Sequence, residues 1–413
     1  MSCETDKIPK KWMDDQLGNV CDVLTGFPFK SSHFSKKEEN IKLVRGDNVK
    51  ERKLVWGDKA RYWDSVTDDL KKYLLKEGDV LIGMDGSKVG KNFAKVKRSD
   101  LPLLLVQRVA CLRAKESISQ DFIVYLIMNK KFSNYVDVIK TGTSIPHISS
   151  KQIQEYPIVL PPILEQQKIA SILKSLDDKI ELLHETNETL EQIAQALFKH
   201  WFINFEFPDE NGNPYRSSGG AMKPSPMGMI PEDWDVGQFS RIINITSGKR
   251  PEQKSEYKTH DYSIPLIGAS SIMGFVKEPL YKSPILVIGR VGTHGIVQRM
   301  TCPCYPSDNT LVINSAYYSY VYQLLNSIDY RHLNVGSTQP LITQSSIKQY
   351  EITIPKEDIL KKYENITSIL FKKIDVNLKN IQSLTELRDL LLPRLMSGKI
   401  RVPVKEGDEP CQA

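Results

Sequence analysis

Three short segments of the chain hold residue types that could catalyse a reaction or bind a nucleotide or a metal. Asn213-Pro214-Tyr215 is one proline short of the Asn/Asp-Pro-Pro-Tyr/Phe motif of DNA methyltransferases. Gly86–Asn92 has neither the spacing nor the Ser/Thr of a Walker A loop, which favours a plain glycine-rich turn. Cys302 and Cys304, with His294 nearby, supply three ligands where a structural zinc site usually has four. We therefore expect no catalytic residue, no cofactor and no metal in this chain.

The clearest basic segment is Ser87–Arg98, which contains five lysines and arginines and no acidic residue. Lys88 and Lys91 lie on the glycine-rich turn, where basic side chains could hold the phosphates of a nucleic acid. Lys95 and Lys97 fit an exposed strand face equally well, because charged residues are common on solvated surfaces. The turn, rather than the whole segment, is the candidate binding element.

Two turns of the first half of the chain recur in the second half. The glycine-rich turn recurs with Arg290 and His294, and Gly142–His147 recurs as Gly336–Leu341. Lysine and arginine bind phosphates, and Ser, Asn, Gln and Arg can bond to base edges. The recurrent turns therefore supply eight candidate binding residues: Lys88, Lys91, Thr143, Ser144, Arg290, His294, Ser337 and Gln339.

These recurrences belong to a tandem duplication. Six framework residues between Gly142 and Pro161 recur after the same 194 positions. Ile169–Leu173 recurs as Ile366–Leu370, and Leu81–Gly86 recurs as Val287–Gly292. A unit of about 200 residues is too long for a solenoid repeat and has the size of a domain with an appendage.

Each copy begins with short apolar runs separated by turn residues and ends in a long helix. Val80-Leu81-Ile82 and Ile285–Ile288 are typical of buried strands. Pro161-Pro162 and Pro355 predict the helix starts, since proline is tolerated in a first helical turn but not in a helix interior. The expected fold class is α+β, a duplicated globular α/β domain in which a long helix follows each copy.

Both helices carry an apolar seam at steps of three and four residues. The first seam runs from Ile169 to Trp201 and is interrupted only by Asn187. The second runs from Tyr363 to Leu395, is weaker, and contains Asn377. Such seams predict an antiparallel coiled coil, in which a polar core residue sets the register. Two amphipathic helices that pack separately on their own domains are the alternative.

One antiparallel register satisfies all the seam residues at once. It places Asn187 opposite Asn377, where the two amides can bond to each other in an apolar interface. The same offset pairs Leu173 with Leu391, Leu183 with Ile381, and Leu190 with Ile374.

Composition is that of an ordinary globular protein of two or three domains. The 413 residues include 56 Lys and Arg against 50 Asp and Glu, a net charge of +6 that permits contact with a polyanion without requiring it. Six cysteines without a disulfide pattern, no apolar run long enough for a membrane span and no signal-like start predict a cytoplasmic protein without a membrane partner.

Several segments resemble one protein family, the specificity subunits of type I restriction-modification systems. The resemblance covers the starts and ends of both helices and the linker between the copies, while the two variable regions match only in their Gly and Pro framework. Its segments are Leu160–Ala170, Phe198–Phe205, Tyr215–Met222, Met227–Trp234 and Leu391–Ile400.

The resemblance implies two target-recognition domains that read the halves of a bipartite site in double-stranded DNA, with the helices as a spacer. It thereby implies that the eight candidate binding residues contact DNA. It also implies two modification (methyltransferase) subunits as partners, and restriction (translocase and endonuclease) subunits where cleavage occurs. The expected domains are 1–160 and 208–355 for recognition, the latter with its linker, 161–207 and 356–402 for the helical spacers, and 403–413 for a tail.

Two other classes of function compete with a DNA reader. A coiled-coil scaffold that binds no nucleic acid would not need two domains with different loops, and an enzyme would need the motifs that are missing. Within the reader class, a specificity subunit of a modification-only or bifunctional (type IIG/IIB-like) system is the nearest alternative.

Overall fold

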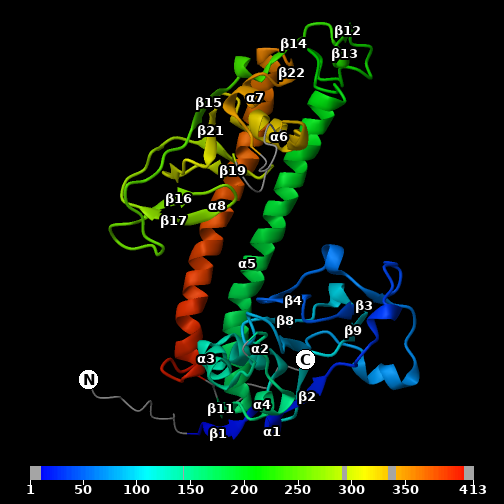
Figure 1. Ribbon diagram of the computed structural model, residues 1–413, viewed down its shortest axis with the longest axis vertical. Helices are drawn as coiled ribbons and strands as arrows, with labels where there is room; N and C mark the ends of the chain where they lie inside the picture. Colours follow the sequence, from blue (N-terminus) through cyan, green and yellow to red (C-terminus); the bar gives the residue numbers. More distant parts are fainter. Residues whose placement is uncertain (1–10, 143, 291–294, 334–340, 404–413) are drawn as a thin grey trace. The chain divides into compact units, whose positions relative to one another are not determined.

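The computed structural model describes residues 11–142, 144–290, 295–333 and 341–403 (Figure 1). The chain folds into two compact units. The first contains Met1–Glu181 and Gln382–Ala413, and the second contains Leu182–Ile381. Helices α5 (Ile163–Phe198) and α8 (Glu357–Met396) each contribute one part to each unit.

The first unit is built on an antiparallel sheet of order β2-β10-β7-β8 and a smaller sheet of order β6-β3-β9. In the smaller sheet β3 pairs with β9 in parallel and with β6 in antiparallel fashion. The strands are β2 (Cys21–Thr25), β3 (Ile41–Val44), β6 (Tyr62–Trp63), β7 (Val80–Gly83), β8 (Phe93–Lys95), β9 (Leu103–Leu105) and β10 (Val109–Ala114).

Short helices and two short strand pairs complete this unit. Strand β1 (Met13–Gln16) pairs with β11 (Pro157–Leu160), the strand that leads into α5, and the hairpin β4 (Val49–Lys50) and β5 (Lys53–Leu54) follows β3. The short helices are α1 (Leu17–Val20), α2 (Gln120–Met128), α3 (Lys130–Ile139) and α4 (Ser150–Gln154). Their apolar faces pack on one side of the large sheet, and the burial of this apolar surface stabilises the unit.

The second unit repeats this topology. Its large sheet has the order β15-β21-β18-β19, and its smaller sheet has the order β17-β16-β20 with the same parallel and antiparallel pairings. The fold therefore confirms the tandem duplication. The strands are β15 (Asn244–Ser247), β16 (Ile264–Ile267), β17 (Ile272–Val276), β18 (Ile285–Gly289), β19 (Val297–Met300), β20 (Tyr305–Pro306) and β21 (Thr310–Asn314).

The remaining elements follow the same plan. Strand β14 (Asp235–Gln238) pairs with β22 (Glu351–Ile354), the strand that leads into α8, and the linker forms the hairpin β12 (Met222–Ser225) and β13 (Gly228–Pro231). The short helices of this unit are α6 (Tyr318–Ser327) and α7 (Gln344–Lys348). None of the helices in the described residues is long and apolar enough to cross a bilayer.

The prolines start the two long helices where the sequence predicts. Helix α5 begins directly after Pro162, and α8 begins two residues after Pro355. In the first unit, Leu173 of α5 and Leu391 of α8 pack in the same hydrophobic core. Nearby, the nearly buried guanidinium of Arg388 donates to Asp177 at 2.6 Å, so an ion pair joins the helices at this level.

In the second unit the helices meet through the two asparagines. The buried Asn377 donates from Nδ2 to Oδ1 of Asn187 at 2.8 Å, which is the contact that the antiparallel register requires. Leu190 and Ile374, another pair of that register, belong to one apolar cluster. Knobs-into-holes packing along the whole seam stays a prediction.

The asparagine pair leaves two polar atoms without partners, because Asn187 Nδ2 and Asn377 Oδ1 are buried and make no hydrogen bond to any described atom. We expect Asn187→Leu alone to destabilise the second unit by about 1–3 kcal/mol, since it strands the amide of Asn377. Asn187→Leu with Asn377→Leu should recover that loss or exceed it. Urea unfolding of the single and double variants checks this, and a double variant less stable than either single one would contradict it.

The end of α5 changes to a π-helical turn, Lys199–Ile203, which carries two bulky aromatic residues into the second unit. Phe202 packs edge-on against Tyr320 and Tyr363, with ring centroids 4.6 and 5.0 Å apart. The aromatic residues that follow α5 thus pack inside the second unit instead of forming a free docking patch.

Candidate nucleic-acid interface

The candidate interface of the first unit lies at one edge of its sheets, where several strands end together. Thr25 at the end of β2 and Gly83 at the end of β7 pair with Ala110 and Val109 at the start of β10. The parallel strands β3 and β9 end side by side, and Val106 donates to the carbonyl of Val44 at 3.1 Å. The loops that follow these strands must therefore converge on one surface.

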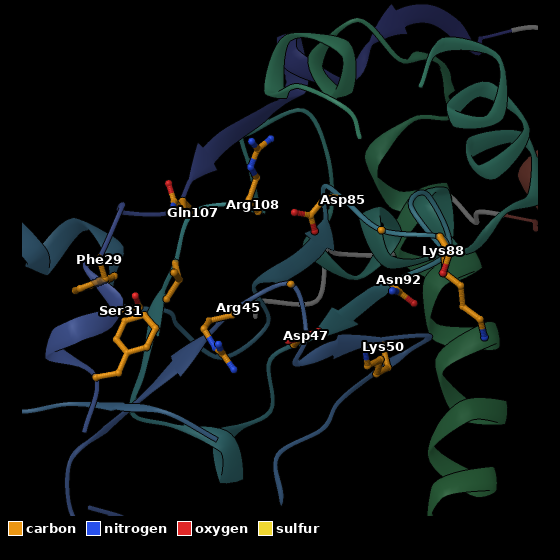
Figure 2. Close-up of a pocket in the computed structure, with 15 residues that line it drawn as sticks. Phe29, Ser31, Arg45, Asp47, Lys50, Asp85, Lys88, Asn92, Gln107 and Arg108 are labelled. Atoms are coloured by element: carbon orange, nitrogen blue, oxygen red, sulfur yellow. The ribbon is translucent and has the colours of Figure 1, made fainter. Parts of the chain in front are cut away.

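The converging loops enclose an open cleft of about 790 Å³. Its wall combines four basic residues, two acidic residues, small polar side chains and two phenylalanines (Figure 2). The lining residues are Phe29, Ser31, Phe34, Arg45, Gly46, Asp47, Lys50, Asp85, Gly86, Ser87, Lys88, Asn92, Val106, Gln107 and Arg108.

The cleft has an excess of positive charge, because four basic residues line it against two acidic ones. Within the described residues, Lys50, Lys88 and Arg108 form no ion pair, and Lys88 and Arg108 are exposed. Figure 2 shows Lys88 extending at one edge of the lining, with Phe29 and Ser31 at the other and Arg45 between them. Long exposed cations that flank a groove suit the two phosphate backbones of a duplex.

The glycine-rich turn that carries Lys88 is fixed by a hydrogen bond to a neighbouring turn and by one within the turn itself. Gly86 donates its N–H to the carbonyl of Pro146 at 3.0 Å, and Lys91 donates to the carbonyl of Lys88 at 2.9 Å. Gly86 and Gly90 have φ values of +96° and +81°, which L side chains rarely adopt. The contact with Pro146 brings together the two turns that recur in the sequence.

The predicted binding residues of the first unit do not all line the cleft. Lys88 lines the cleft, and Lys91 is exposed on the same turn but outside the lining. Ser144 is exposed on the neighbouring turn, also outside the lining, and Thr143 lies outside the described residues.

For Lys95 and Lys97 the structure agrees with the other interpretation that the sequence allows, charged side chains on a solvated surface. Lys95 pairs with Asp121 of α2 and Lys97 pairs with Glu181 of α5, so both are engaged in surface ion pairs within the first unit. Neither lines the cleft.

In the second unit, Arg290 follows β18 as Met84 follows β7. It is half-buried, its N–H donates to the carbonyl of Asn309 at 2.9 Å, and its carbonyl accepts from Ile342. Its Nε is buried and has no partner among the described atoms. His294, Ser337 and Gln339 lie outside the described residues.

The cysteines considered as metal ligands have different surroundings. Cys304 is fully buried beside β18 and β21, where burial raises the pKa of its thiol to about 12, and Cys302 is exposed. The described residues contain no group of three or more side chains that could hold a metal ion.

Most of the polar cleft residues, among them Arg45, Gln107 and Arg108, were not predicted from the sequence. Arg45 and Gln107 follow β3 and β9, two strands that become neighbours only in the folded sheet. Arg108 has a φ of +70°, an uncommon value for a residue with a side chain and one often found at functional sites. No local pattern encodes these positions, although the apolar runs that precede them could have pointed to strand ends.

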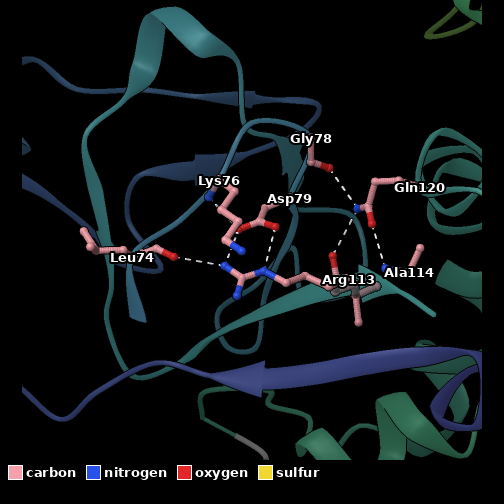
Figure 3. Close-up of polar contacts among 8 residues, drawn as sticks. Leu74, Lys76, Gly78, Asp79, Arg113, Ala114 and Gln120 are labelled. Carbon is pink, nitrogen blue, oxygen red and sulfur yellow. Dashed lines mark hydrogen bonds and ion pairs between the residues drawn. The ribbon is translucent and has the colours of Figure 1, made fainter. Parts of the chain in front are cut away.

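An ion pair between the half-buried Arg113 and the buried Asp79 fixes the two central strands of the large sheet at the end away from the cleft (Figure 3). Arg113 of β10 makes two bonds to Asp79, from Nε at 2.8 Å and from Nη2 at 2.7 Å, and also donates to the carbonyl of Leu74. Asp79, which is almost fully buried, precedes β7. The hydrogen bond to Asp79 is the main cause that raises the pKa of Arg113.

Gln120 continues this network from the start of α2. Its amide donates to the carbonyls of Gly78 and Leu112 at 2.8 and 3.2 Å, and its carbonyl accepts from the N–H of Ala114 at 2.7 Å. The network sets the position of β7, and therefore of the turn with Lys88 at the other end of that strand.

Comparison with known proteins agrees with the repeated architecture. The sequence profile of the "type I restriction modification DNA specificity domain" matches residues 9–192 and 231–387. The chain is 28% identical to the type I restriction enzyme MjaIX specificity subunit of Methanocaldococcus jannaschii, over 97% of this chain and 96% of that protein. It is 25% identical to the MjaVIII specificity subunit of the same organism, over 80% and 81%.

A solved structure has the same fold. The S subunit of the type I restriction-modification system from M. genitalium superposes with a TM-score of 0.61 at 17% identity, covering 96% of this chain and 98% of that one. Because the two matched ranges together span most of the 413 residues, the chain belongs to the family of type I restriction-modification DNA specificity proteins and carries two copies of its domain.

Proposed function

We propose that this chain is the DNA specificity subunit of a type I restriction-modification complex, and that each of its two recognition domains reads one half of a bipartite site. The observation that carries the proposal is one topology built twice with different loops at the corresponding strand ends. A protein that binds two copies of one partner gains from such a repeat, and the two sets of loops give it two different half-sites.

The cleft of the first unit supports the DNA part of the proposal. Unpaired cations at its edges suit phosphates, and the polar and arginine side chains between them suit base edges in a groove. The chain itself is non-catalytic in this proposal. Adenine methylation comes from two modification subunits, and ATP-dependent cleavage comes from restriction subunits. A modification-only or bifunctional system would use the same chain without a separate translocase.

Mapping of methylated adenines in the source cell, with and without the intact chain, tests the proposal. We expect one bipartite motif to lose methylation when the chain is removed and to return when it is restored. Purified chain co-expressed with methyltransferase subunits should retard a duplex with that motif more strongly than a scrambled duplex. A methylome that does not change on removal would reject the proposal.

Lys88→Ala combined with Lys91→Ala should weaken DNA binding and flatten its salt dependence. Each phosphate contact contributes about 0.9 to the slope of log K against log salt concentration, so the slope should fall in magnitude by about two. Titrating a labelled duplex at several salt concentrations measures it.

Lys95→Ala combined with Lys97→Ala is the matched control, because it removes the same charge from the same segment but from residues already engaged in ion pairs. Its slope should stay close to that of the unmodified chain. If both double variants change the slope equally, Lys88 and Lys91 do not contact phosphates specifically.

A further inference from the structure

Arg45 differs from the other cations of the cleft in how it is held. It follows β3 directly and is half-buried, and its Nη2 donates to the carbonyl of Lys59 at 2.8 Å. The guanidinium also lies over the ring of Phe34, 5.8 Å from its centroid. A cation that only binds phosphates does not require such anchoring, because a flexible and exposed lysine can bind a phosphate.

The backbone that carries Arg45 is fixed as well. Its N–H donates to Oδ1 of the fully buried Asn48 at 3.1 Å, and its carbonyl accepts from the N–H of Asn48 at 2.9 Å. Asn48 also donates to the carbonyl of Val55 at 3.0 Å. The turn after β3 is therefore closed around a buried amide, and Arg45 enters the cleft from a preorganised position.

Nη1 of the Arg45 guanidinium makes no hydrogen bond within the described residues and is the nitrogen left for a ligand, together with the second N–H of Nη2. Its Nε is buried without a hydrogen-bond partner, and the bond to Lys59 is its side chain's one hydrogen bond within the described residues. Arginine presents its remaining donors as a planar fork, which matches the O6 and N7 acceptors of guanine in the major groove.

Asp85 supplies the complementary group on the facing turn. An ideal Cβ built on Gly46, the residue after Arg45, would lie 2.9 Å from Oδ1 of Asp85, so the carboxylate lies against this turn. Figure 2 shows Arg45 and Asp85 both between the two edges of the lining, and no ion pair joins these two residues. A carboxylate repels phosphates but can accept from the N4 amino group of cytosine.

We propose that Arg45 reads the guanine of one G·C base pair in the half-site of the first unit, with Asp85 facing the cytosine. This inference rests on the proposed function, because it requires that the cleft binds duplex DNA. The proposal divides the cleft into two parts. Its interior reads the bases, and its edges, which carry Lys50 and Lys88, hold the phosphate backbone of the DNA.

The test uses the chain co-expressed and purified with its methyltransferase subunits, and duplexes that carry the mapped motif with each base pair substituted in turn. Arg45→Gln should lower the preference for the correct base pair by about 5- to 150-fold at one G·C position of one half-site, the range expected for loss of a bidentate contact. Every position of the other half-site should keep its preference. Lys88→Gln is the matched control. It should lower the methylation of every duplex by about the same factor, whichever base pair is substituted.

Arg45→Lys covers the case in which Arg45→Gln does not fold. It keeps the charge but loses the planar fork, so the preference should fall at the same base pair by a smaller factor. The inference is overturned if either folded Arg45 variant lowers methylation of all duplexes equally, or if every position keeps its full preference. A complex with unmodified Arg45 that prefers no duplex at all would instead reject the proposed function.

Discussion

Arg113→Met should destabilise the first unit by about 3–5 kcal/mol, because it leaves the carboxylate of Asp79 buried without its charged partner. Hydrogen exchange measured by peptide is the suitable observable, since a chain of two units need not unfold in one step. Peptides of β7 and β10 should lose protection, while peptides of β18 and β21 in the second unit should keep it.

Arg113→Met combined with Asp79→Asn is the control for this prediction. It removes both charges but keeps an acceptor for the N–H of Lys76, which bonds to Asp79 at 2.8 Å. Much of the lost protection should return, because a buried neutral amide costs far less than an unpaired buried carboxylate. If the double variant is as unstable as the single one, the loss comes from packing and not from the stranded charge.

Gly90→Ala should destabilise the first unit by about 3 kcal/mol and weaken DNA binding. A Cβ at this position would lie 2.7 Å from Cβ and Cγ1 of Val136 on α3, and the φ of +81° adds a backbone cost. Overpacking costs about 1–3 kcal/mol, and a left-handed conformation costs about 1–2 kcal/mol for a residue with a side chain. Thermal unfolding and duplex titration measure the two effects.

Gly86→Ala separates the two causes, because Gly86 lies on the same turn with a φ of +96° but has no atom within 4 Å of an added Cβ. It should show the backbone cost alone, about 1–2 kcal/mol. Gly90→Ala with Val136→Ala should be more stable than the sum of the single effects, since the clash is absent. Equal losses for Gly86→Ala and Gly90→Ala would mean that Val136 moves away freely.

Features that depend on one segment or on a repeated pattern could be predicted from the sequence. The prolines gave the starts of α5 and α8, and the seam placed Asn187 opposite Asn377, which are hydrogen-bonded in the structure. Both predictions use local rules, the missing N–H of proline and the periodicity of a helix.

The interior of the cleft could not be predicted in this way. Arg45 lies there because β3 pairs in parallel with a strand about 60 residues later, and because a buried asparagine closes its turn. Arg108 lies there because its backbone has a positive φ. Such positions depend on tertiary pairing, whereas Lys88 was found because glycines mark its turn in the sequence itself.

The division of α5 and α8 between two units has a consequence for the order in which the chain folds during synthesis. The second unit is one continuous segment, whereas the core of the first unit includes Leu392, Leu395 and Met396 from α8. Domains usually mature from the N-terminus onward as the ribosome adds about 5–20 residues per second. Here the segment made first must wait for α8 to complete its core, so the unit encoded later can finish folding earlier. An interrupted translation product that stops before Gln382 would expose the apolar face on which α8 packs, which makes it a substrate for chaperones and proteases.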